Sequence, residues 1–347
     1  MSSSGLKTQN FKIMTNDNKQ QKLSGSTKPA IDYSTCYRQY GINVLSLFDG
    51  MSCGQIALQK AGIKVNQYFA SEIKPHAIKV TQHNFPNTIQ LGSVLDVKAS
   101  ELPKIDLLIG GSPCQDFSSA NKEKLGLQGE KSGLFYEYLR LLKECEPKYF
   151  LLENVAMDDY SYAAISEMLG TYPTNINSEL VSGQLRQRSY WTNIGPESFD
   201  LFGNRYSMIP QPRNKKIKFQ DLLDNGYTDR LKARCLLESE SRNPGSTFSS
   251  LRRYMIQGFI NVIFKDKETF EKYSKMTEDE MKENFIDGDI RKLNQNEMER
   301  LQTVPNGYTS ILKRNEAACL LGDGWTVDTI AHIFSFIEVE CSNYAQS

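Results

Sequence analysis

Short apolar runs alternate with stretches of helical periodicity from residue 43 onward. Residues 43–48 form an apolar run of strand length, a turn follows at 49–54, and a helix is expected from about 55 to 60. The order then repeats, with a strand at 67–71 and a helix that begins near Pro75, because proline suits the first turn of a helix.

The next part of the chain continues this alternation. Residues 105–110 and 148–152 have the apolar character of buried strands. Between them, apolar residues recur at helical spacing: Leu134, Tyr138, Leu141, Leu142 and Cys145. Strands that alternate with helices imply a parallel sheet with helices on both faces, and such sheets bind ligands outside the carboxyl ends of their strands. The pattern therefore predicts an α/β fold with a binding crevice at that edge.

The remaining segments are less regular. Residues 196–289 hold scattered turn signals and a charged, helix-like run at 266–284, and helical periodicity returns from Ile290. Residues 1–41 are polar and aperiodic, so we expect a largely disordered arm, and 338–347 form a short tail.

Composition favours a soluble intracellular protein. None of the apolar runs in the 347 residues approaches the roughly 20 needed to span a bilayer. The polar N-terminus does not resemble a secretory signal. The seven cysteines include no C-x-x-C pair and there are only three histidines, so neither a zinc site nor a disulfide framework is expected.

The charge distribution leaves a nucleic-acid partner open. A formal net charge of zero argues mildly against one. Residues 204–253, however, contain eleven Lys or Arg and only five Asp or Glu. This stretch is either a solvated charged surface or a contact for phosphates.

A glycine turn follows the first predicted strand. Gly50 and Gly54 would let the backbone approach a ligand closely, although their spacing is not that of the dinucleotide motif G-x-G-x-x-G. About twenty residues later Glu72 ends the second strand, where a carboxylate can accept both hydroxyls of a ribose. Together they favour a nucleoside-bearing cofactor over a plain turn and a surface carboxylate.

Three polar motifs follow later strands. Cys114 lies in Gly-Gly-Ser-Pro-Cys-Gln after the strand at 105–110, in a turn that would project a nucleophilic thiolate into the crevice. Residues 116–131 are expected to form a mobile loop. Glu153 directly follows the strand at 148–152 and can meet Cys114 at the same edge of the sheet, where a carboxyl can donate to a ring nitrogen. In an extended run, Gln184, Arg186 and Arg188 share one face.

In this order the motifs resemble the C5 cytosine-specific DNA methyltransferase family, whose last segment is matched by Arg291–Asn294, Glu299–Gln302 and Gly322–Val327. The amino-acid sequences of these motifs are most similar to those of the animal de novo type and of phage and bacterial relatives. The resemblance covers 42–195 and 290–337 as the catalytic domain, and it implies a Rossmann-like AdoMet-dependent methyltransferase sheet. It places 196–289 where the family has a small target-recognition domain.

The resemblance implies a mechanism in which Cys114 attacks carbon 6 of a flipped-out cytosine and carbon 5 then takes the methyl group of AdoMet. Glu153 would donate to N3 and hold the exocyclic amine, and Arg188 would contact O2. Arg186 and Gln184 would position that strand and the loop.

The same resemblance assigns the cofactor pocket to eight residues: Phe48, Asp49, Gly50, Gly54, Glu72, Leu134, Trp325 and Val327. Ser93 departs from the family pattern, because the family often has Asp at this position to contact the adenine amine of AdoMet. Here Asp96 or a backbone group would have to make that contact. Arg252 and Arg253 are candidates for DNA contact. The target sequence is not predicted.

Three alternatives stay open. A tRNA-directed member of the family would use identical chemistry, although the Cys-Phe-Thr signature of that branch is not found in 196–289. A non-catalytic DNA-binding paralogue would be expected to lose Cys114. Folate-dependent pyrimidine methylation also uses cysteine attack on carbon 6, but the glycine turn and Glu72 favour AdoMet. The sequence does not distinguish the possible biological roles, which are restriction-modification, phage protection and epigenetic marking. It also leaves open the oligomeric state, and whether the protein is located in bacterial or phage-infected cytoplasm or in a nucleus.

Overall fold

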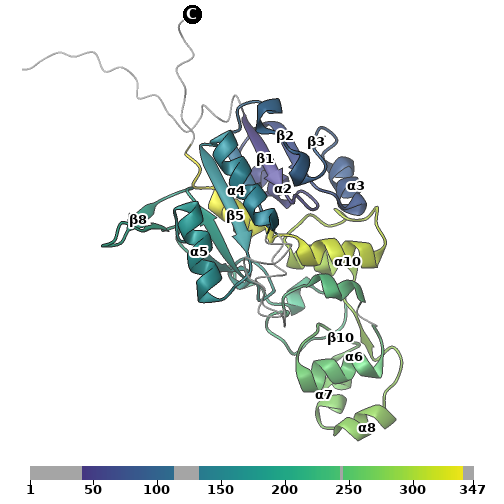
Figure 1. Cartoon of the computed structure of the whole chain (residues 1–347). Helices are drawn as coiled ribbons and strands as arrows, with labels where there is room; N and C mark the ends of the chain where they lie inside the picture. The colour runs from purple at the N-terminus through teal and green to yellow at the C-terminus, as the bar shows by residue number, and fades with distance from the viewer. Residues whose placement is uncertain (1–40, 113–132, 243–244, 339–347) are drawn as a thin grey trace, which may run out of the picture. The chain divides into compact units, whose positions relative to one another are not determined.

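The computed structural model describes residues 41–112, 133–242 and 245–338, and Figure 1 shows how their elements are arranged. Four parts of the sequence-based prediction lie outside these residues: the N-terminal arm up to residue 40, Cys114, the loop at 116–131, and the tail from residue 339.

A seven-stranded sheet organises the described chain. In spatial order its strands are β3 (Ile89–Gln90), β2 (Val65–Ser71), β1 (Ile42–Leu47), β4 (Leu107–Gly110), β5 (Tyr149–Asn154), β7 (Gln187–Thr192) and β6 (Thr174–Asn177). The strands from β3 to β5 are parallel to their neighbours, whereas β7 runs antiparallel to β5 and β6. The predicted α/β sheet is confirmed, with an antiparallel strand that the periodicity did not indicate.

Helices cover both faces of this sheet, as predicted. Successive strand residues enter two different hydrophobic clusters, so that Leu151 belongs to one and Leu152 to the other. The first face carries α2 (Cys53–Lys60), α3 (Pro75–Asn84), α9 (Gln295–Leu301), α10 (Arg314–Asp323) and α11 (Val327–Phe334), and the second carries α4 (Gly133–Cys145) and α5 (Asp159–Leu169). Burial on both sides explains why these strands read as continuous apolar runs.

The region 196–289 divides its contacts between two cores. Its elements are β8 (Glu197–Phe199), β9 (Arg205–Ser207), α6 (Phe248–Arg252), β10 (Ile263–Phe264), α7 (Lys267–Ser274) and α8 (Glu278–Glu283), and β10 pairs with β11 (Ile290–Arg291). Leu251, Phe264 and Tyr273 help to form a small separate cluster, whereas Phe219 and Leu236 join the first-face core of the sheet. The predicted boundary at 196 therefore does not coincide with the end of that core.

The run predicted as one helix at 266–284 is two helices. Thr277 starts α8 with a capping box in which its side chain and that of Glu280 satisfy each other's backbone N–H groups. A second helix start at this point breaks the run after Ser274.

No described helix combines the length and apolarity needed to cross a bilayer. The described residues also contain no group of three or more His, Cys, Asp or Glu that could hold a metal ion. Four described cysteines, Cys53, Cys145, Cys235 and Cys319, are free thiols.

Candidate active site

The motif residues meet at the carboxyl edge of β4 and β5. These strands pair in parallel, which places the residues after β4 beside the end of β5. Asn154 Nδ2 donates a hydrogen bond to Ser112 Oγ at 3.2 Å. A Cβ placed on Gly111 would lie 3.2 Å from Glu153 Oε2, so an added side chain would crowd the carboxylate. The segment that leads to Cys114 is thus held against Glu153, although Cys114 itself lies outside the described residues.

Glu153 differs from the prediction in its position, because it lies inside β5 rather than after it. It pairs with Arg188 from β7, with 2.9 Å between Arg188 Nε and Glu153 Oε1 and side chains that are 12% and 11% exposed. The antiparallel register of β5 and β7 sets Glu153 opposite Tyr190. The ion pair orients the carboxylate, with Oε1 on Arg188 and Oε2 towards Gly111.

Gln184 and Arg186 are turned into the protein. Gln184 is completely buried, and its amide donates to the Leu301 carbonyl at 2.7 Å. Arg186 is 3% exposed and donates to the carbonyls of Leu236 and Gly324, both at 2.8 Å. The two side chains therefore tie the start of β7 to segments far along the chain, which supports a positioning role.

The turn after β1 has unusual backbone geometry. Phe48, Gly50 and Ser52 have φ angles of 57°, 58° and 59°. For Phe and Ser this left-handed region is strained, and such strain concentrates at functional sites. A Cβ added to Gly50 would meet no atom within 4 Å, so the space at this turn is open. Gly50 N–H donates to Glu72 Oε2 at 2.8 Å, which joins the two predicted cofactor elements.

Gly54 lies at a close contact between α2 and the sheet. A Cβ there would lie 2.5 Å from Ile109 Cδ1 and 2.9 Å from Tyr68 Oη. The missing side chain thus lets α2 pack closely on the sheet, and a cofactor contact at Gly54 stays a prediction.

The remaining predicted cofactor residues fall into two groups. Trp325 is half-buried. It lies beside the site, because its Nε1 would be 3.0 Å from a Cβ placed on Gly111. Leu134 is also half-buried, at the start of α4. Val327 is completely buried in the core, so a direct contact between its side chain and a cofactor stays a prediction.

The residues at this edge fit a cofactor that carries a ribose. Glu72 is partly exposed, and its carboxylate already accepts N–H groups from Gly50, Ile73 and Lys74. A carboxylate has about four lone-pair sites, so Glu72 retains capacity for about one ribose hydroxyl. The Ser93 side chain makes a local contact, in which its hydroxyl accepts a hydrogen bond from the Leu95 N–H at 3.3 Å.

Burial dominates the electrostatics of Asp49. Burial raises the pKa of this carboxyl to about 6, although hydroxyl hydrogen bonds, including those from Ser52 and Tyr68, oppose the shift. Tyr68 Oη donates to Asp49 Oδ1 at 2.8 Å. A fold that disfavours the ionised form of Asp49 must lose stability when that form becomes dominant.

We therefore expect the wild-type protein to lose stability relative to Asp49→Asn as pH rises from about 4 to 7. The pKa of Asp49 in the folded protein, about 6, exceeds the ordinary value of 3.8 for an aspartate. The folded state thus binds the extra proton in this window and loses that advantage as pH increases. The full pKa difference corresponds to about 3 kcal/mol, of which about 2 kcal/mol falls between pH 4.5 and 7.5. Urea unfolding of both proteins at pH 4.5 and 7.5 measures this difference, and identical pH dependence in both would contradict it.

Burial also removes Cys53 from the list of nucleophiles. It raises the pKa of this thiol to about 12, so the thiolate is scarce near neutral pH. Burial raises the pKa of the Cys145 and Cys319 thiols as well.

The candidate DNA contacts are partly exposed. Arg252 ends α6 and forms an ion pair with Glu278, and Arg253 opens a π-helical turn, Arg253–Gln257. The acidic partner lowers the charge that Arg252 presents, and contact of either residue with DNA stays a prediction.

Sequence reasoning missed two polar residues that support the site. Asn154 joins the ends of β4 and β5 through Ser112. Gln302 is completely buried and accepts hydrogen bonds from Gln184 and Thr326 through its Oε1. The available signal for Gln302 was its place in the matched segment Glu299–Gln302, to which no role was assigned.

Comparison with known proteins places this site in context. Residues 42–158 match the family model described as C-5 cytosine-specific DNA methylase. The orphan methyltransferase M.Rho11sI of Bacillus phage rho11s is 40% identical over 116 residues, which are 33% of this chain and 23% of that protein. The Type II methyltransferase M.NlaIV of Neisseria lactamica is 37% identical over 118 residues, 33% of this chain and 28% of that protein. The matched segment thus spans about a quarter of these relatives.

Solved structures share the fold. The crystal structure of S. pombe Dnmt2 methyltransferase superposes with a TM-score of 0.59 and 16% identity, over 85% of this chain and 97% of that one. The Entamoeba histolytica methyltransferase EhMeth has the same TM-score, identity and coverage. At this identity the likeness establishes the architecture alone.

Proposed function

We propose, because residues 42–158 match the C-5 cytosine-specific DNA methylase family model, that the chain transfers a methyl group from AdoMet to carbon 5 of a cytosine in duplex DNA. The observation that carries this proposal is the placement of Glu153, paired with Arg188, against the segment that leads to Cys114. A nucleophile, a carboxyl group and a cation at one edge can together activate a pyrimidine ring.

Cys114 is proposed as the nucleophile. Its thiolate forms a bond to carbon 6, and the electron pair of the C5–C6 double bond moves into the ring. Carbon 5 then becomes electron-rich, and negative charge spreads towards N3 and O2. Charge of this kind must be met by donors that are already in place.

Glu153 and Arg188 would supply those donors. Glu153 Oε2 faces Gly111, which has no side chain to block a base, while Oε1 is held 2.9 Å from Arg188 Nε. In this proposal the Glu153 carboxylate takes up a proton from solvent when the base binds, and the resulting carboxyl group donates to N3. Its other oxygen accepts from the exocyclic amine, and the guanidinium contacts O2. Arg186 and Gln184 keep β7 in position through their buried contacts.

The cofactor residues would be Phe48, Gly50, Glu72 and Trp325, around the open turn after β1. AdoMet bound there would supply the methyl group to carbon 5, and the remainder of the cofactor would leave as a neutral thioether. Loss of the carbon 5 proton and departure of the Cys114 sulfur then restore the aromatic ring. Because carbon 5 is stacked inside a duplex, the cytosine must first leave the helix.

The substrate is tested by offering duplex DNA and tRNA to the full chain with methyl-labelled AdoMet. We expect label in duplex DNA, and bisulfite sequencing of DNA from cells that express the chain would report the modified base and its context together. Label in tRNA alone would overturn the DNA assignment and retain the chemistry. No transfer to any cytosine-containing duplex or tRNA would overturn the proposed function.

A further inference from the structure

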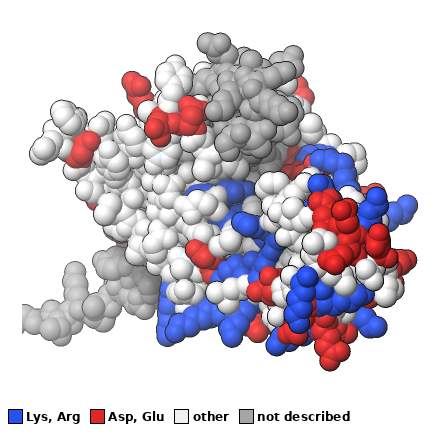
Figure 2. Space-filling model, turned by 90° about the horizontal axis from the view of Figure 1, so that it is seen from below, with Lys and Arg blue, Asp and Glu red and all other residues white. Residues whose placement is uncertain are grey.

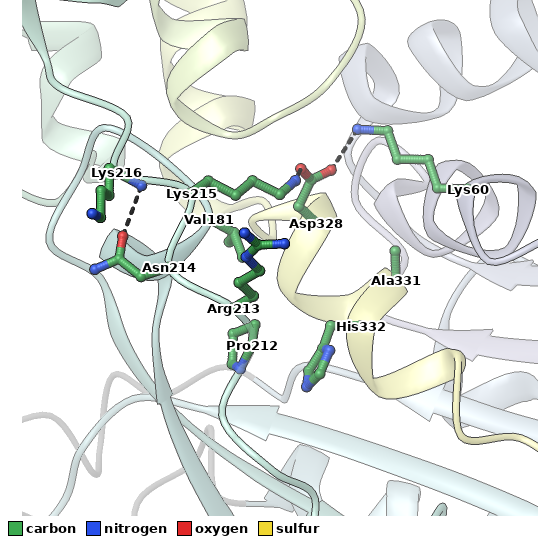
Figure 3. Close-up of a pocket in the computed structure, with 10 residues that line it drawn as sticks. All are labelled: Lys60, Val181, Pro212, Arg213, Asn214, Lys215, Lys216, Asp328, Ala331 and His332. Atoms are coloured by element: carbon green, nitrogen blue, oxygen red, sulfur yellow. Dashed lines mark hydrogen bonds and ion pairs between the residues drawn. The ribbon is translucent and has the colours of Figure 1, made fainter.

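A basic groove lies beside α11, in a part of the fold that the proposed chemistry does not use. It encloses about 1030 Å³ and is lined by Lys60, Arg213, Lys215, Lys216, Asp328 and His332, with an apolar floor that includes Val181 and Ala331. Figure 3 shows Lys60 and Lys215 reaching Asp328 from opposite sides, with Arg213 extending into the space between Asp328 and His332. Two of the four cations, Lys60 and Lys215, thus pair with this carboxylate, whereas Lys216 lies apart from it on the Asn214 side of the lining.

Specific contacts hold the cationic side of this groove in place. Lys215 N–H donates to the Leu180 carbonyl at 2.8 Å, and Lys215 Nζ lies 2.5 Å from Asp328 Oδ2. The His332 ring bonds the Pro210 carbonyl at 2.7 Å. The segment from 210 to 216 is therefore fixed to α11 and to the chain before β7. A fixed arrangement of cations costs a ligand little ordering entropy.

The internal ion pairs do not neutralise the groove. Asp328 is shared by Lys60 at 2.6 Å and Lys215 at 2.5 Å, and desolvation of this carboxyl opposes the net lowering of its pKa by these lysines. Arg213 and Lys216 are exposed and add two further positive charges. The lining consequently has a net charge of +3, from four cations and one anion, with His332 counted as neutral.

The spread of these charges selects the class of ligand. A single small anion is best held by donors that converge on one point, whereas these cations are distributed along a wide groove. Nucleic acid presents phosphates at regular intervals along an extended backbone and binds chiefly through such contacts. Lys and Arg side chains also gather in a stretch across the face seen from below in Figure 2.

We propose that this groove binds phosphodiester groups of duplex DNA outside the segment that enters the active site. The choice of DNA as the polyanion rests on the proposed function, whereas the binding of phosphates rests on the groove. Such contacts would add affinity without sequence information, because they go to the backbone.

The test uses fluorescence anisotropy with a labelled duplex of about 40 base pairs and the full chain without cofactor, over a series of salt concentrations. Compared proteins are the wild type, the double variant Arg213→Glu/Lys216→Glu, and a control, Lys79→Glu/Lys104→Glu, which reverses two exposed charges outside the groove lining. Lys60 and Lys215 are kept, so the Asp328 pairs remain.

We expect the groove variant to bind duplex DNA at least about tenfold more weakly than the control. The slope of log affinity against log salt concentration should also become shallower by about one for each cation removed. Affinity and salt slope equal to those of the control would overturn the proposal. Binding without cofactor is independent of methyl transfer. If the wild type binds duplex DNA but transfers no methyl group, the proposed function is refuted. If the wild type transfers methyl groups and the groove variant binds DNA as well as the control does, only this inference is refuted.

Discussion

Replacement of Glu153 by Gln is expected to lower kcat by about 10²- to 10⁴-fold, the usual contribution of a positioned proton donor. The glutamine keeps the shape of the side chain and can still place an amide near Arg188. It cannot, however, give a proton to the pyrimidine N3 when charge enters the ring. The loss should fall mainly on kcat, because the interaction strengthens as the charge develops. Single-turnover transfer to duplex DNA at saturating AdoMet measures it.

A matched control separates chemistry from folding. Glu240 is also buried and pairs with an arginine, with 3.3 Å between its Oε1 and Arg314 NH2. Glu240→Gln therefore imposes a comparable loss of a buried carboxylate away from Glu153. If the two variants lose similar stability and Glu240→Gln stays active, the effect of Glu153→Gln is chemical. Equal loss of activity in both variants would mean that Glu153 has only a structural role.

Much of the sheet could be predicted because burial on both faces leaves a simple mark. Leu151 and Leu152 point to opposite clusters, so their strand is apolar throughout, and Pro75 marks the start of a helix. A continuous apolar run does not, however, indicate whether a strand is parallel or antiparallel to its neighbour. β7 is antiparallel, and its sequence, QRSYWT, contains nothing that separates it from a parallel strand.

The polar support of the site could not be predicted, because it joins residues far apart in the chain. Gln184 meets Gln302 across 118 positions, and Arg186 meets the Gly324 carbonyl across 138. From sequence alone, the alternation in the Gln184–Arg188 run indicates a shared face and not the partners of these side chains. Likewise, the role of Gly54 depends on Ile109 and Tyr68, which only the packing of α2 brings into contact.

The basic groove illustrates the same limit. Lys60, Lys215 and Asp328 lie in three distant segments and meet only when α2, the 210–216 segment and α11 are in place. The sequence indicated an excess of basic residues at 204–253. It did not indicate that part of this excess faces a carboxylate on another element.

Replacement of Cys114 by Ser is expected to reduce methyl transfer on the order of 10⁴-fold or more, while AdoMet still binds. Removal of a covalent nucleophile has effects of this size in enzymes of other classes. A serine hydroxyl is almost fully protonated near neutral pH and attacks carbon 6 poorly. The proposed cofactor residues Phe48, Gly50 and Glu72 are unchanged, so calorimetry should report an unaltered affinity for AdoMet.

The covalent step itself can be observed with duplex DNA that carries 5-fluorocytosine at the target. Fluorine at carbon 5 cannot leave as a proton, so the bond between carbon 6 and the sulfur persists after methyl transfer. The wild type and a Cys145→Ser control, altered at the half-buried end of α4, should both give an adduct that survives denaturing electrophoresis. The Cys114→Ser protein should give none. Wild-type turnover in Cys114→Ser, or an adduct that persists in that variant, would show that another group attacks the ring, because the sulfur at 114 is then dispensable.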